Sequence, residues 1–190
     1  MGRSIARRLA AFSALALALG PLACASRRAA PVPPPATGPG RTRPRSEQDP
    51  SDVAARVVDA HNAERARRRL RPLVPNPLLD AAAIGQAQDM AARRRMSHKG
   101  SDGSSPFERI SRQGYKFRAA GENVAYGFDE VEQVMDGWMR SPGHRRNILG
   151  AYAEIGVGRA VDPGGSTYWS VTFGTPQAPR ISPGTSGRGL

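Results

Sequence analysis

Residues 138–149 read WMRSPGHRRNIL, and this stretch decides the fold. Pro142 fits the first turn of a helix but cannot continue a helix that began earlier, so one helix ends before Ser141 and a short one runs through Leu149. His144 then lies just after the turn that joins the two helices, where its side chain can face a binding site. The stretch therefore predicts a helical region that carries one candidate functional residue.

Upstream, capping and proline signals predict two longer helices. A cap at Ser51 or Asp52 begins a helix that continues to the arginines at 67–69, whose charges suit the negative end of the helix dipole. Pro77 begins a second helix, which ends near Met96. Apolar residues recur at helical spacing in both, which is typical of helices that cover one side of a core.

Two shorter helices and a hairpin complete the predicted elements. Residues 105–108 (SPFE) form a capping box before a helix that Gly114 can end, and residues 129–132 repeat the capping logic. Residues 155–161 and 168–173 alternate loosely around an Asp-Pro-Gly-Gly turn, which predicts a hairpin. Helices first and paired strands last predict an α+β fold, and a length of 190 residues favours one domain.

The first 25 residues have the pattern of an export signal. A basic segment precedes the apolar run 9–19, which is too short to span a bilayer comfortably. Cys24, the only cysteine, follows this run. Either the signal is cut before Ser26, or Cys24 becomes the lipidated first residue of a lipoprotein. Both alternatives export the domain, and a single cysteine allows no intramolecular disulfide.

Composition divides the rest of the chain. Residues 26–50 are rich in Pro and Arg and predict a disordered linker, 51–176 form the folded domain, and 177–190 form a disordered tail. The formal net charge is +12, but residues 51–176 contain 18 basic and 14 acidic side chains, a net of only +4. The arginine runs at 67–69 and 93–95 fall at predicted helix ends, so we expect no nucleic-acid partner.

The chain has three histidines, and their contexts differ. His61 lies mid-helix beside apolar residues, which favours a structural role. His98 and His144 each follow a predicted helix end or turn, and Glu122 lies between two glycine-flanked turns. If the fold brings the last three together, His98 and His144 could bind a first-row metal ion such as Zn²⁺, with the carboxylate orienting an imidazole.

Several motifs occur in an order that is typical of one family. They are His61-Asn62-x-x-Arg65, Ser97-His98, Gly121-Glu122-Asn123, Ser141-Pro142-Gly143-His144 and Tyr168-Trp169. Together they resemble the CAP superfamily (cysteine-rich secretory proteins, antigen 5, pathogenesis-related 1), and in particular its disulfide-free bacterial branch.

The resemblance implies a three-layer α-β-α sandwich with an open cleft, in which family members place two histidines and two acidic residues. His98, Glu122 and His144 match three of these positions, and Ser141 stands at the fourth. A hydroxyl is a poor replacement for a carboxylate as a metal ligand, so the resemblance implies weaker zinc binding than in relatives, or none.

Two functions follow from this interpretation. We expect a non-enzymatic extracellular binding module, monomeric and either secreted or anchored to the cell envelope, whose cleft takes a lipid, glycan or protein. The alternative is a metal-assisted hydrolase or peptidase, with His98 or His144 as general base and Glu122 orienting it. These three residues are the only catalytic candidates, and Ser141 completes the predicted cleft.

Overall fold

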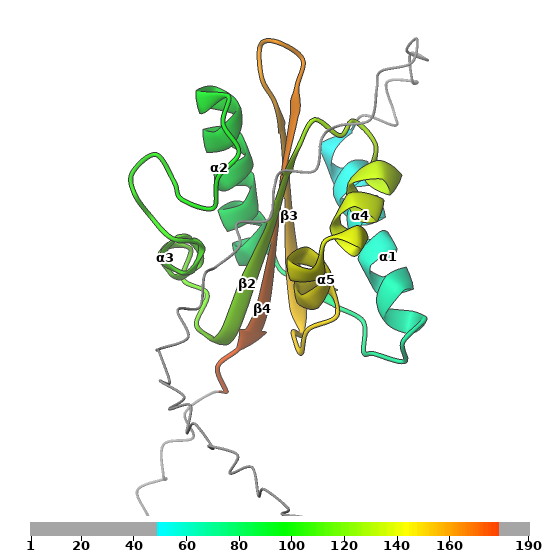
Figure 1. The fold of residues 1–190 in the computed structure, drawn as a ribbon. Helices are drawn as coiled ribbons and strands as arrows, with labels where there is room; N and C mark the ends of the chain where they lie inside the picture. The colour runs from blue at the N-terminus through cyan, green and yellow to red at the C-terminus, as the bar shows by residue number, and fades with distance from the viewer. Residues whose placement is uncertain (1–48, 179–190) are drawn as a thin grey trace, which may run out of the picture. The chain divides into compact units, whose positions relative to one another are not determined.

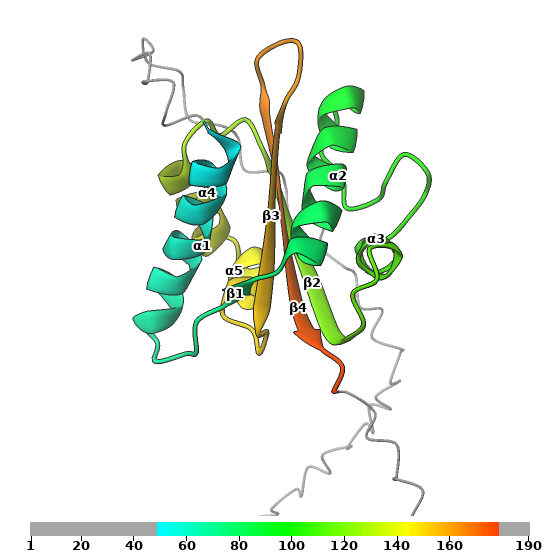
Figure 2. The ribbon, with the colours of Figure 1, turned by 180° about the vertical axis from the view of Figure 1, so that it is seen from behind.

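The computed structural model describes residues 49–178, which form an α+β unit of three layers. Its elements are α1 (Pro50–Ala66), β1 (Val74–Pro75), α2 (Pro77–Arg93), α3 (Pro106–Arg112), β2 (Phe117–Tyr126), α4 (Val131–Arg140), α5 (Pro142–Ile148), β3 (Glu154–Val161) and β4 (Thr167–Pro176). The sheet stands in the middle, with α2 and α3 on one face and α1, α4 and α5 on the other (Figure 1). The view from behind shows the same layers (Figure 2). The predicted α-β-α sandwich is confirmed.

Three predicted segments lie outside the described residues. They are the export signal with Cys24, nearly all of the linker, and most of the tail. Within the described residues, none of the helices is both long and apolar enough to cross a membrane.

The sheet has four strands in the order β1-β3-β4-β2, so β2 forms one edge. Both β2 and β3 pair antiparallel with β4, whereas the short β1 pairs parallel with β3. The β3–β4 hairpin was expected, but β2 corrects the prediction that Glu122 lies between turns. Glu122 is in the middle of β2, opposite Thr172. The strand is rich in small residues and poor in β-branched ones, so it forms through its pairing with β4 rather than through local preference.

The first two helices begin and end slightly away from their predicted limits. The N-cap of α1 is Asp49, which accepts a hydrogen bond from the backbone N–H of Ser51, so neither Ser51 nor Asp52 caps the helix. The second helix ends at Arg93 rather than near Met96, because Arg94 adopts a left-handed conformation with φ of 49°.

The shorter helices follow their predicted signals more closely. In α3, Ser105 and Glu108 make both hydrogen bonds of the capping box. Gly114 follows the end of this helix with φ of 86°, a conformation that suits glycine. The N-cap of α4 is Glu130, and within the described residues its side chain makes no capping hydrogen bond, so the second predicted capping box is wrong.

Helix α2 packs directly on the backbone of β3. A Cβ on Gly156 would lie 2.1 Å from the carbonyl carbon of Leu79, and one on Gly158 would lie 2.2 Å from the carbonyl oxygen of Ala83. These distances are far below van der Waals contact, so only glycine lets the helix come this close. The two glycines therefore fix the position of α2, and with it the loop that carries His98.

Asn62 and Arg65 tie α1 to the loops around it. The amide of Asn62 donates to the carbonyl of Leu73 and accepts from its N–H, at 3.0 and 2.7 Å. Arg65 is buried, and its guanidinium donates to several backbone carbonyls. These belong to Arg71, Ile148, Gly150 and Tyr152. The His61–Arg65 motif is therefore structural in this fold.

His61 is completely buried in the core, as its apolar neighbours predict. Its ring lies between Trp138 and Phe173, with centroids 5.7 Å from each. Nδ1 is 2.7 Å from the carbonyl oxygen of Val57, so the neutral ring donates its proton there. Among the described residues Nε2 has no hydrogen-bond partner. Burial lowers the pKa of His61 from 6.5 to about 4.

This lowered pKa predicts a loss of stability in mild acid. Below pH 6.5 the unfolded chain takes up a proton that the folded protein does not bind until about pH 4. The contribution of His61 is therefore complete above pH 6.5 and falls by about 1.4 kcal/mol per pH unit as the pH drops toward 4. Urea unfolding at several pH values between 6.5 and 5 measures this slope.

The matched control is His61→Leu, which keeps an apolar side chain in the core but removes the titrating group. His144, whose pKa is also lowered, acts in the same direction, so the difference between the two proteins isolates His61. Equal slopes in the wild type and in the variant would show that His61 does not cause the acid sensitivity.

Candidate functional site

The histidine site is defined here as His98, Arg109, Glu122, Ser141 and His144, which come from the edge strand β2 and from elements on both faces of the sheet. Glu122 is at its centre. The side chain is only 1% exposed, because it points from β2 toward the face that α2 and α3 cover. Its Oε1 is 2.8 Å from His98 Nδ1, and its Oε2 is 2.6 Å from Arg109 Nη2. The Ser170 hydroxyl is 3.5 Å from the same Oε2. Both carboxylate oxygens therefore have partners.

The carboxylate sets the orientation of His98. Because Glu122 can only accept at Oε1 when it is ionised, Nδ1 of His98 carries the proton of this hydrogen bond. Nε2 is then left on the side of the ring that points away from Glu122. The His98 side chain is 54% exposed, so this nitrogen is available to a ligand. A histidine held in this way is suited to bind a metal, accept a proton or contact a ligand.

Arg109 completes the site, and sequence reasoning missed it. Its side chain is 11% exposed, and besides Glu122 it donates to the carbonyl of Ser104 at 3.0 Å. The guanidinium compensates the charge of the buried carboxylate, which would otherwise be costly to remove from water. The chain contains 28 lysines and arginines, and no local pattern distinguishes this one. Only the packing of α3 against β2 identifies it.

Two asparagines fix α5, and so His144, against the other side of the same strand. Asn123 donates to the carbonyl of His144 at 3.1 Å. Asn147 donates to the carbonyl of Glu122 at 3.1 Å and to Oδ1 of Asn123 at 2.9 Å. The pKa of His144 is lowered, first by burial and then by the positive charge of His98. The fold thus joins His98 to Glu122 by a direct hydrogen bond, whereas His144 is held beside the same strand through its backbone carbonyl.

Ser141 lies at the junction of α4 and α5, three residues before His144. It occupies the N-cap position of α5, and its backbone carbonyl accepts from the N–H of Arg145 at 2.9 Å. Its hydroxyl makes no capping hydrogen bond within residues 49–178. The hydroxyl is therefore not needed to begin the helix that carries His144.

The histidine site has too few side chains that could coordinate a zinc ion. In the part of the chain that the structure describes, no three His, Cys, Asp or Glu side chains are grouped so that they could hold a metal. Glu122 already has His98 and Arg109 on its two oxygens, which leaves the imidazoles of His98 and His144 as protein ligands. Catalytic zinc sites use three protein ligands and structural sites use four, so these residues do not fit either kind.

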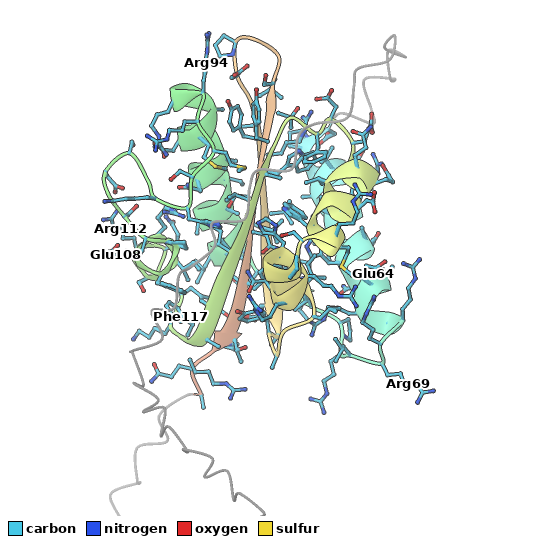
Figure 3. All side chains as sticks on the ribbon, in the orientation of Figure 1. Glu64, Arg69, Arg94, Glu108, Arg112 and Phe117 are labelled. Atoms are coloured by element: carbon cyan, nitrogen blue, oxygen red, sulfur yellow. The ribbon has the colours of Figure 1, made fainter. Side chains whose placement is uncertain are left out.

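The two arginine runs do not form one basic surface. Arg69 lies at the end of α1 and Arg94 at the end of α2, on opposite sides of the sheet and at opposite ends of it (Figure 3). Several of the neighbouring arginines are paired with acids on their own helices. These pairs are Arg67 and Arg68 with Glu64, and Arg93 with Asp89. The runs therefore act as helix-terminal charges, as their positions predict.

Comparisons with known proteins agree on one family. Residues 58–173 match the family model CAP, the cysteine-rich secretory protein family. The chain is 39% identical over 113 residues to the uncharacterized protein YkwD of Bacillus subtilis (strain 168), covering 57% of this chain and 44% of that protein. It is 30% identical over 103 residues to the uncharacterized membrane protein YlbC of the same organism, covering 54% and 30%. The matches thus span less than half the length of these relatives.

Solved structures share the fold. One is an extracellular protein containing an SCP domain from Bacillus anthracis str. Ames, at 26% identity and a TM-score of 0.63, with 72% of this chain and 45% of that chain covered. Another is an outer surface protein from Borrelia burgdorferi, at 22% identity and a TM-score of 0.61, with 65% and 92% covered.

The pairing of Arg109 with Glu122 predicts a large effect of removing one partner. Arg109→Met leaves a carboxylate buried with only His98 and a distant hydroxyl, and should lower the free energy of unfolding by about 3 kcal/mol. Glu122→Gln in the same chain removes the stranded charge and should restore most of the loss. Urea unfolding of the wild type, both single variants and the double variant gives the coupling energy. Additive losses would mean that the two side chains do not act as a pair.

Proposed function

Because this chain belongs to the cysteine-rich secretory protein (CAP) family, we propose that it is an exported binding module that takes its ligand at the histidine site. The observation that carries the proposal is the buried Glu122 carboxylate, which holds an exposed His98 ring in one orientation. An apolar side chain could fill the same position in the sheet without a charge to compensate. The cluster is therefore better explained by a task at the surface than by stability.

The ligand class we propose is a lipid, a glycan or a protein segment outside the cytoplasm. Support comes from the exposed His98 and the partly buried His144, which flank the edge strand β2 and offer polar side chains from two separate elements. Export is supported by the signal pattern of the first 25 residues, and by the relative from Bacillus anthracis, which is an extracellular protein. We propose a monomer, secreted or anchored to the cell envelope.

A metal-assisted hydrolase or peptidase is the second candidate. One observation favours it: Glu122 orients His98 so that Nε2 faces outward, which is the arrangement of a general base. The metal would have to be held by His98 and His144 alone, and two ligands make a weak site. Since the donor set does not fit a metal, the site supports no hydrolytic step that depends on one.

The His98→Ala/His144→Ala double variant tests the binding proposal. The control variant is Arg69→Ala, a surface substitution just after the end of α1. We expect the wild type and Arg69→Ala to bind the same members of a panel of lipids and glycans, and the double variant to lose at least tenfold in affinity. Circular dichroism should show that the double variant still folds, although its urea unfolding midpoint falls because Oε1 of Glu122 loses its donor. Calorimetry measures the affinities. Equal binding by all three proteins would place the ligand elsewhere.

The same proteins decide between the two candidates. Zinc chloride in a thermal unfolding titration should shift the wild-type midpoint by little or nothing. A clear rise in the wild type that the double variant lacks, together with cleavage of a peptide substrate, would support the hydrolase and contradict a metal-free binding module.

Cys24 is the proposed point of attachment to the membrane. If it is lipidated, the wild-type chain should sediment with the membrane fraction of cells, and Cys24→Ala should move most of it to the soluble fraction of the envelope or to the medium. Immunoblots of the fractions measure the distribution. A wild-type chain that is already soluble would show that the signal is cut before Ser26 and that the protein is free.

A further inference from the structure

The two segments that carry the imidazoles bring positive charge and no negative charge. Residues 97–101 contain Lys99, and residues 141–150 contain Arg145 and Arg146, whereas neither segment contains Asp or Glu. All three cationic side chains belong to exposed residues. Lys99 directly follows His98 in the sequence, and Arg145 and Arg146 directly follow His144.

The acids nearest in sequence do not offset this charge. Glu122 is buried and is already compensated by Arg109. Asp102, which follows the first segment, pairs with Arg112, and its pKa is lowered mainly by hydrogen bonds from Ser104. The exposed part of the histidine site thus has cationic neighbours, and neither of these carboxylates is free to face them.

The charged side chains of the two segments, unlike Glu122 and Asp102, are suited to donate hydrogen bonds rather than to accept them. Arginine and lysine have only donors, and the Ser141 hydroxyl can donate without adding charge. A cation at this position would meet repulsion from Lys99, Arg145 and Arg146, whereas an anionic oxygen would meet donors and favourable charge.

We propose that the ligand group bound at the histidine site is an anionic oxygen group, a phosphate or a carboxylate, with Arg145 and Arg146 as the principal source of favourable charge. This inference rests on the proposed function, because it names the chemistry of the ligand for the same site. It gives Arg109 a defined positioning role: by compensating Glu122 inside the protein, it keeps the negative charge of that carboxylate from repelling the ligand.

The test uses inorganic phosphate and the full-length chain. Addition of sodium phosphate at pH 7, against sodium chloride at the same ionic strength, should produce saturable shifts of the ring signals of His98 and His144 in ¹H–¹³C NMR spectra, while the buried His61 signals stay fixed. Arg145→Glu/Arg146→Glu should weaken phosphate binding at least tenfold. The matched control, Arg69→Glu/Arg71→Glu, makes the same charge change at the end of α1 and should bind as the wild type does.

A lipid arm identifies the source of the anion. Vesicles of phosphatidylglycerol and of phosphatidylcholine are sedimented with each protein. Retention on phosphatidylglycerol alone, lost in Arg145→Glu/Arg146→Glu and reduced by free phosphate, assigns a lipid headgroup. Phosphate binding without retention on either vesicle assigns a soluble anion, and both results support the proposal.

Two results would overturn the inference, and they separate it from the proposed function. If a neutral glycan or lipid shifts the His98 and His144 signals but phosphate does not, the site binds ligands and the anion proposal fails. If phosphate binds equally to the wild type and to both double variants, the arginines of α5 do not select the ligand. Ring signals that no probe moves would contradict the proposed function as well.

Discussion

An ionised carboxylate buried at the edge of a sheet imposes conditions on everything around it. Glu122 is removed from water, so each of its oxygens requires a donor, and the donors come from separate elements: Arg109 from α3 and His98 from the loop after α2. Helix α3 must lie against β2 for the Arg109 guanidinium to reach Glu122. The loop after α2 must turn back toward the strand for the His98 imidazole to form its hydrogen bond. One charge therefore holds the α2–α3 side of the site in place.

The other side depends on the backbone of the same strand. Alternate carbonyls of β2 accept side-chain hydrogen bonds, from Tyr152 to residue 120, from Asn147 to residue 122 and from Trp138 to residue 124. Carbonyls at every second position of an antiparallel strand point the same way, here away from β4. These bonds satisfy an edge that could otherwise pair with another chain. They also hold α4 and α5 beside the strand, so the position of His144 follows from the protection of the edge.

The sequence predicts the helices well because their signals are local. Proline at the first turn and the capping box of α3 need only neighbouring residues, and the Gly-rich hairpin is recognised in the same way. Strand β2 escaped prediction because its pairing partner lies far along the chain. The residues of the histidine site also fall into two groups, those that the sequence identifies and one that it does not. His98, Glu122 and His144 could be named from motif order, but Arg109 acquires its role only when α3 packs on β2, a contact that no spacing in the sequence expresses.

Long-range contacts of buried charged side chains also explain how the connections of this fold are held in place without a disulfide. The chain has one cysteine, so no disulfide can tie its long connections. Arg65 takes that role: from the last turn of α1 it donates to the segment before β1, to the end of α5 and to the segment between α5 and β3. Such charge-assisted bonds constrain the loops only while α1 is folded and packed, because the guanidinium must be held in place. Loop order on this side is therefore coupled to the core around His61, whereas order on the α2–α3 side depends on Glu122. Two buried charges, one basic and one acidic, fix the connections that flank the two faces of the sheet.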